Sequence, residues 1–271
     1  MEFVYIAVLA FLAETLDASM GMGYGTILSP LLISFGFHPI AAIPALLLSQ
    51  AFGGFAASVF HHEEGNVTFT RTSRDSKVVF MITVLGLVAV VFGALVAVGL
   101  PKLYLKVYIG VLVLVMGVIL LSRFSFRFSW RKMVGVGVIS SFNKGISGGG
   151  FGPVVTSGQI IAGNDHKSAI GCTTAAEAPI CIAGFVAFCL AGQAAGIPAE
   201  AIWSFTVAGI SMVIPKMVLP LTLGAIVAAP FGAKITKRVA NEKLRPIIGV
   251  LVTVLGVWAL YQAQAWKIFG I

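Results

Sequence analysis

Long hydrophobic segments follow one another along the chain, and clusters of glycine interrupt two of them. The clusters are Gly21-Met22-Gly23-Tyr24-Gly25 and Gly148-Gly149-Gly150-Phe151-Gly152. The uninterrupted segments are long enough to cross a bilayer as helices, since about 20 apolar residues span its hydrocarbon core. Irregular backbone is tolerated at that depth only where it is buried in protein or lines a polar cavity. We therefore interpret the two clusters as helix breaks around a substrate site.

Each half of the chain is expected to hold one interrupted segment followed by three continuous ones. In the first half the predicted segments cover residues 3–37 (interrupted), 39–60, 78–100 and 104–121. In the second half they cover residues 133–163 (interrupted), 168–190, 217–235 and 246–263. The pattern predicts an all-α polytopic membrane protein whose residues 1–271 form a single transmembrane domain.

The two halves align with each other at fixed offsets. An offset of 127 residues superposes the two glycine clusters, Asp17 on Lys144, and Gln50 on Glu177. An offset of 139 residues superposes Phe92-Gly93-Ala94 on Phe231-Gly232-Ala233. We interpret these matches as internal repeats over residues 1–127 and 128–271.

The distribution of Lys and Arg selects between two topologies. In the first topology each interrupted segment is a re-entrant or broken helical hairpin, which leaves three transmembrane helices in each half and inverts the second half. In the second topology each interrupted segment crosses the membrane, and the two halves are parallel. With Lys144 and Lys216 set aside, hairpins place 13 basic residues on one side and 3 on the other, whereas crossing places 8 on each side. The positive-inside rule favours hairpins. We predict two inverted repeats whose glycine tips meet near the midplane of the inner cell membrane, with both termini outside.

Composition supports this assignment and argues against other classes of protein. Hydrophobic residues make up 58% of the chain and charged residues 10%, and the mean hydropathy is +1.01, whereas soluble domains are about one quarter charged. The net charge of +8 reflects orientation in the membrane rather than nucleic-acid binding. Cys172, Cys181 and Cys189 lack metal-ligand spacing, and no P-loop, zinc-protease or nucleophile-elbow motif occurs. We expect no cofactor, no metal and no enzymatic activity.

The predicted substrate site combines an intramembrane lysine with two helix ends. Half-helices that begin near Thr26 and Pro153 would direct free N–H groups and positive dipole ends into the site, which favours an anion. Ser19, Ser147, Thr156 and Ser157 add hydroxyl donors. The predicted substrate-binding residues are Ser19, Gly21, Gly23, Gln50, Lys144, Ser147, Gly148, Gly149, Gly150 and Glu177. The structural alternative is that the glycines only permit close packing and that Lys144 pairs with Asp17.

Glu14, Asp17 and Glu177 are candidates for proton coupling, because a carboxyl group in an apolar environment can take up a proton and release it when exposed. The alternatives are a helix-end residue for Glu14, a partner of Lys144 for Asp17, and a hydrogen-bonding strut for Glu177. Two peripheral features are also predicted. Residues 199–214 are expected to form a helix on the membrane surface. His61, His62, Glu63 and Glu64 are expected to begin a solvated cytoplasmic loop, with a metal site as the alternative.

The tips GMGYG and SGGGFGP, their repetition, the Phe-Gly-Ala segments and the length of the chain together resemble the sulfite exporter TauE/SafE family of membrane permeases. The resemblance implies a central site shared by both halves and export of small sulfur-containing anions such as sulfite, sulfoacetate or organosulfonates. Carried over by motif, that site lies on Gly21, Gly23, Lys144, Ser147, Gly148, Gly149 and Gly150.

Two other functional classes stay open at the level of sequence. An ion channel is suggested by Met22-Gly23-Tyr24-Gly25, which is similar to a potassium-channel filter, although such filters need a ring of identical loops. An intramembrane enzyme would use the carboxyl groups of Glu14, Asp17 and Glu177, although no nucleophile with an adjacent base is evident. The sequence is also compatible with a homo-oligomer in the lipid bilayer.

Overall fold

The computed structural model describes residues 2–122, 130–161, 164–192, 202–207, 210–238 and 244–264. Helices dominate because a helix satisfies its own backbone hydrogen bonds, which lipid cannot do. In chain order the elements are α1 (Glu2–Met20), α2 (Tyr24–Ser34), α3 (Pro39–Glu63), α4 (Arg74–Gly99), α5 (Lys102–Leu121), α6 (Trp130–Ser147), α7 (Phe151–Ile161), α8 (His166–Gly192), β1 (Ile202–Val207), β2 (Ile210–Pro215), α9 (Val218–Arg238) and α10 (Leu244–Gln262). The predicted all-α architecture is confirmed, with one small β-hairpin added.

Six helices of the described residues are long and apolar enough to cross a membrane, namely α1, α3, α4, α5, α8 and α9. The apolar helices α2 and α10 are shorter. Large apolar side chains are exposed on the outer faces, among them Phe80 at 71% and Phe55 at 66%. Patches of this kind are rare on soluble monomers and suit a lipid-facing surface. The protein is therefore a multi-pass membrane protein.

Local sequence signals explain where two of the long helices begin. α3 starts at Pro39, as predicted, because the side chain of His38 accepts the Ile40 N–H and proline fits the first helical position. α4 starts before the predicted segment 78–100, because the hydroxyl of Ser73 accepts the Ser76 N–H and caps the helix. Hydropathy alone marks the apolar part of a helix and misses a polar first turn of this kind.

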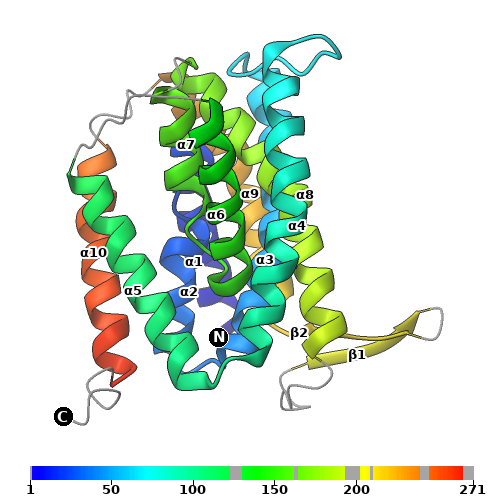
Figure 1. Cartoon of the computed structure of the whole chain (residues 1–271), viewed down its shortest axis with the longest axis vertical. Helices are drawn as coiled ribbons and strands as arrows, with labels where there is room; N and C mark the ends of the chain where they lie inside the picture. The colour runs from blue at the N-terminus through cyan, green and yellow to red at the C-terminus, as the bar shows by residue number, and fades with distance from the viewer. Residues whose placement is uncertain are drawn as a thin grey trace.

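The most extensive helix contacts join the first half of the chain to the second. α1 packs along α9 and α6 along α4, while α3 packs against α8 and α5 against α10. The same four pairs result when each of α1 to α5 is replaced by its counterpart in α6 to α10, in chain order, and the reverse. In Figure 1 the α3–α4 connection lies at the upper end of the molecule and the α4–α5 connection at the lower end. α3 and α8 stand in the middle of a series of packed helices, since α3 also packs against α9 and α8 also packs against α4.

The α5–α10 pair stands at one edge of the bundle (Figure 1). Its helices approach closely through small residues, since Gly117 of α5 lies against Thr253 and Gly256 of α10 lies against Leu114. α2 contacts both helices of the pair and also α3 and α1. The short broken helix α2 is therefore a link between this pair and the centre of the bundle.

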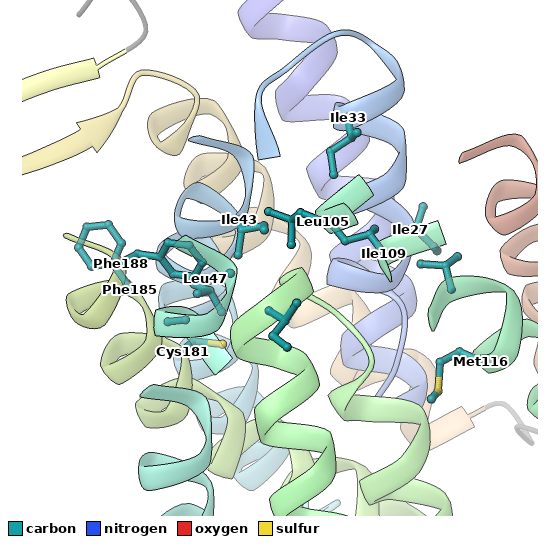
Figure 2. Packing of buried hydrophobic residues seen from close by; sticks show 14 of the residues in the cluster. Ile27, Ile33, Ile43, Leu47, Leu105, Ile109, Met116, Cys181, Phe185 and Phe188 are labelled. Atoms are coloured by element: carbon teal, nitrogen blue, oxygen red, sulfur yellow. The ribbon is translucent and has the colours of Figure 1, made fainter. Parts of the chain in front are cut away.

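An apolar cluster runs from α5 through α2 to α3 and α8, and Figure 2 shows it from close by. Its labelled members are Ile27, Ile33, Ile43, Leu47, Leu105, Ile109, Met116, Cys181, Phe185 and Phe188. Cys181 is fully buried in this cluster, in agreement with a packing role. Its members Leu47 and Cys181 lie about one turn from Gln50 on α3 and from Glu177 on α8, so apolar side chains adjoin these polar residues.

The predicted surface helix over residues 199–214 is wrong in the part that the structure describes. β1 and β2 form an antiparallel hairpin in which Ile202 pairs with Pro215 and Val207 with Ile210. The two sequences, IWSFTV and ISMVIP, are rich in β-branched and aromatic residues, which favour extended backbone. The hairpin projects outward at the lower end of the molecule (Figure 1).

Candidate functional site

The two broken helices meet with their backbones in contact. A Cβ atom built on Gly25 would overlap the carbonyl oxygen of Gly148, and one built on Gly152 would overlap the carbonyl oxygen of Gly21. Both overlaps are with backbone, which cannot move aside as a flexible side chain would. Glycine is therefore required at both places for the tips to pack together.

The breaks themselves have the same backbone form in both halves. Gly21 and Gly148, which align at the offset of 127, have φ angles of +68° and +73°. Gly23 and Gly150, which also align, have φ angles of +142° and +81°. These values lie where residues with a Cβ are strained. The following half-helices begin at Tyr24 and Phe151, two residues before the predicted starts at Thr26 and Pro153.

Hydroxyl groups hold the two tips to each other. Ser29 Oγ donates to the Ser147 carbonyl oxygen at 2.6 Å, and Thr156 Oγ1 donates to the Gly21 carbonyl oxygen at 3.0 Å. Thr26 Oγ1 accepts the Gly150 N–H at 3.3 Å. Ser29 was not among the predicted residues, although it aligns with Thr156 at the offset of 127. A search for matched hydroxyls in the two repeats would have found it.

Three of the four predicted hydroxyls, those of Ser19, Ser147 and Thr156, form hydrogen bonds within the protein. Ser19 Oγ donates to the Leu16 carbonyl oxygen at 2.9 Å. Ser147 Oγ donates to the Asn143 carbonyl oxygen at 2.8 Å and accepts the Gly149 N–H at 3.1 Å. A substrate that bound here would therefore exchange partners with the protein rather than meet free donors.

Lys144 of α6 lies at the centre of the site, with 1% of its surface exposed. Its Nζ forms an ion pair with Glu177 Oε1 of α8 at 2.7 Å and donates a hydrogen bond to Gln50 Oε1 of α3. Gln50 and Glu177, which align at the offset of 127, thus contact the same ammonium group. The low dielectric of the interior strengthens these contacts, and it also makes either partner costly to leave alone.

Asp17 joins this network through Gln50 and not through Lys144. Gln50 Nε2 donates to Asp17 Oδ2 at 3.3 Å, and the Tyr24 N–H donates to Asp17 Oδ1 at 3.0 Å. Among the described residues, the ion pair of Lys144 is therefore with Glu177, and the direct pairing with Asp17 considered above is not formed. The Asp17 carboxylate instead caps the N-terminus of α2, whose dipole it complements.

Glu14 lies one turn before Asp17 on α1 and is fully buried. Neither of its carboxyl oxygens has a hydrogen-bond partner within the described part of the chain. The carboxyl group lies against Gly53 of α3, where a built Cβ would be 3.2 Å from Glu14 Cδ. Glu14 is thus in the interior of α1 and not at a helix end, contrary to the simplest alternative for it.

A second polar cluster ties α1 to the ends of α3 and α9. His61 Nε2 is 2.8 Å from the Ala18 carbonyl oxygen, and Thr236 Oγ1 donates to the same oxygen at 3.1 Å. Asn66 Nδ2 donates to the Ala233 carbonyl oxygen at 2.9 Å. The expectation that His61 begins a solvated loop is wrong, because α3 continues to Glu63 and His61 is fully buried. No group of three or more potential metal-ligating side chains occurs in the described ranges.

An apolar groove of about 780 Å³ lies between α3, α4 and α8, apart from the lysine. Phe52, Phe55 and Phe80 of its wall are also exposed on the outer surface, as suits a lipid-facing position. Its lining residues are Ala51, Phe52, Phe55, Ser58, Phe69, Ser76, Val79, Phe80, Thr83, Ala175, Ala178, Pro179 and Ile182. The groove has no charged residue and cannot compensate an anion, so the candidate site is the buried polar network.

Comparison with known proteins places this architecture. The chain is 24% identical over 260 residues to a "Probable membrane transporter protein YtnM" of Bacillus subtilis (strain 168). The match covers 92% of this chain and 79% of that protein. No solved structure matches the chain. Residues 6–259 match the family of the Sulfite exporter TauE/SafE. A match over nearly the whole chain, together with the helical membrane fold, shows that this protein belongs to the sulfite exporter TauE/SafE family of membrane transporters.

Proposed function

We propose that this protein is a permease that exports small sulfur-containing anions, such as sulfite, sulfoacetate or other organosulfonates, across the inner cell membrane. Membership of a family of membrane transporters supports transport rather than enzymatic chemistry. The observation that carries the proposal is the buried cation at the paired tips, since Lys144 is 1% exposed and contacts α3 and α8 together. A charge inside the membrane is costly and marks a functional site by default.

The second tip is the better anion site. At the first tip the Asp17 carboxylate already accepts the Tyr24 N–H, so the positive end of α2 has its own anion. At the second tip the residue that aligns with Asp17 is Lys144, so the ammonium group adds to the dipole of α7 instead of opposing it. An incoming anion therefore gains more at the second tip.

Glu177 occupies the place that we assign to the substrate. Its carboxylate is the anion paired with Lys144 at 2.7 Å, with the two side chains 4% and 1% exposed. A sulfite or sulfonate oxygen would replace Glu177 Oε1 on the ammonium group, while Gln50 keeps its own contact. Without substrate, the charges of Lys144 and Glu177 cancel. Substrate therefore binds by displacing Glu177 and does not enter a site with an uncompensated charge.

Alternating access would proceed by motion of the two inverted repeats, residues 1–127 and 128–271, about the tips. With both termini outside and basic loops inside, the negative cytoplasm favours departure of an anion. The gain is about 2.3 kcal/mol for each net negative charge that leaves per 100 mV, so the potential drives export whenever the transported species carries net negative charge.

The proposal is tested by flux in proteoliposomes held at set membrane potentials. Sulfite and sulfoacetate should move at rates that rise with potential, and a neutral solute of similar size should not move. Flux of the neutral solute at the same rate, or no flux of either anion through protein shown to be folded by its thermal unfolding, would contradict it.

A further inference from the structure

Glu14 differs from the other buried carboxyl groups because nothing in the described structure compensates it. Glu177 has Lys144, and Asp17 has the Tyr24 N–H and the Gln50 amide. Both oxygens of Glu14 are buried and without a partner among the described residues. An unpaired carboxylate in such surroundings is far more costly than a neutral carboxyl group.

Within the described part of the chain, Glu14 forms no ion pair of its own. Asp17 on its own helix and Glu177 on α8 add negative potential there, and Lys144 on α6 adds positive potential. Gly53 of α3 lies against the Glu14 carboxyl group, and Ala225 of α9 lies against Gly53. Since Lys144 is already paired with Glu177, the buried network has more acids than bases.

Small residues shape the surroundings of the Glu14 carboxyl group. A Cβ built on Gly53 would be 3.3 Å from Glu14 Oε1 and 2.7 Å from the Ala225 Cβ. α1 packs along α9, and α3 also packs along α9, so movement of α9 would change the access of water to Glu14. Exposure of a buried carboxyl group to one side at a time is how such a group loads and releases a proton.

We propose that Glu14 is a proton-binding site and that one proton moves with each anion, so that a divalent substrate such as sulfoacetate crosses with one net negative charge and still follows the membrane potential. The inference rests on the proposed transport function. A proton from water binds the Glu14 carboxylate, and the neutral group then tolerates a substrate anion on Lys144 beside the displaced Glu177. On the other side of the membrane the carboxyl group returns the proton to water as the anion leaves. By linkage, protonation of Glu14 and anion binding promote each other.

The test uses methanesulfonate, a sulfonate that stays ionised, in proteoliposomes whose potential is clamped at zero with potassium and valinomycin. The wild-type protein should accumulate it about tenfold on the alkaline side for one unit of pH gradient, because one proton is tied to one anion. Glu14→Gln, which mimics the protonated group, should lose this accumulation and retain exchange of labelled for unlabelled methanesulfonate. Glu64→Gln is the matched control, since it makes the same change in a surface carboxylate, and it should behave as wild type.

Each outcome separates the inference from the proposed function. Exchange in the wild type without any effect of the pH gradient would overturn proton coupling and leave the permease intact. Equal accumulation by Glu14→Gln and wild type would overturn the role of Glu14 alone. Absence of exchange in the wild type would contradict transport of sulfonates and the inference with it.

A spectroscopic measurement covers the case in which Glu14→Gln does not fold. The infrared spectrum of the wild-type protein in detergent should contain the stretch of a protonated carboxyl group, and Glu14→Asp should shift that band. An unshifted band in folded Glu14→Asp would overturn the assignment.

Discussion

The two tips have the same backbone and opposite charge. Gly21 and Gly148 occupy equivalent left-handed positions, yet the residue four positions earlier is Asp17 in the first tip and Lys144 in the second. The first tip closes on itself, because Asp17 accepts the Tyr24 N–H. The second tip depends on other helices to neutralise its lysine. We therefore propose that the shared backbone form provides the scaffold and that the position occupied by Asp17 or Lys144 determines which tip receives an anion.

The largest effect should come from removing the cation of the second tip. Lys144→Gln should lower the affinity for sulfite about 100-fold, because truncating one partner of a buried charge pair formed on binding costs about 2–5 kcal/mol. Isothermal titration of the purified protein measures this change. Since Glu177 is left unpaired, Lys144→Gln/Glu177→Gln is the folded reference, and Lys237→Gln in the surface pair with Glu64 is the neutral control. Unchanged affinity in the double variant would remove the distinction between the tips.

The shared backbone should be the next most sensitive feature. Gly25→Ala and Gly152→Ala should each destabilise the protein by about 1–3 kcal/mol, as overpacking does elsewhere, because each new methyl group meets a carbonyl oxygen of the opposite tip. Thermal unfolding in detergent should show similar losses for both. Gly99→Ala is the control, since a Cβ there meets no atom within 4 Å. A loss confined to one of the two variants would show that the tips are not equivalent in packing.

Removing the negative charge of Glu177 should increase the difference in anion affinity between the two tips. Glu177→Gln should raise sulfite affinity about tenfold, equivalent to 1.4 kcal/mol, because the substrate no longer competes with a carboxylate for Lys144. Competition binding against labelled sulfite measures the change. A fall in affinity would instead make Glu177 part of the substrate contact.

The smallest effect should come from the charge of the first tip. Asp17→Ala should cost about 1 kcal/mol of stability through loss of the cap on α2, while Asp17→Asn should keep most of it, because an amide oxygen also caps a helix. Sulfite affinity should change by no more than about threefold in Asp17→Asn. A loss as large as that of Lys144→Gln would place substrate at both tips.

The apolar segments and the helix breaks could be predicted from the sequence, because hydropathy and glycine act locally. Predicted residues 39–60 correspond to α3 at Pro39–Glu63, and the interruption in residues 133–163 corresponds to the break between α6 and α7. The burial of Lys144 also followed, since it lies in an apolar segment.

The side-chain contacts between helices could not be predicted from the sequence. Helical periodicity shows which face of a helix is apolar, but not how the neighbouring helix is rotated. The pairing of Lys144 with Glu177 rather than Asp17 depends on how α6, α3 and α8 pack. The lack of a hydrogen-bond partner for Glu14 among the described residues likewise depends on helix packing, which places Gly53 against its carboxyl group. The hairpin β1–β2 was missed because an apolar stretch of that length suits either a helix or strands.

The exchange of partners between halves has a consequence for biosynthesis. α1, α4 and α5 have their most extensive contacts with α9, α6 and α10, all encoded later in the chain. While the ribosome is still translating the first half, these helices have lipid or the insertion machinery as neighbours. Domains usually assemble in order of synthesis, but here the helices that pack against α1, α4 and α5 are complete only when α10 has emerged. A messenger truncated after the first repeat should therefore yield inserted but unassembled helices for proteases to remove, and no half-size carrier.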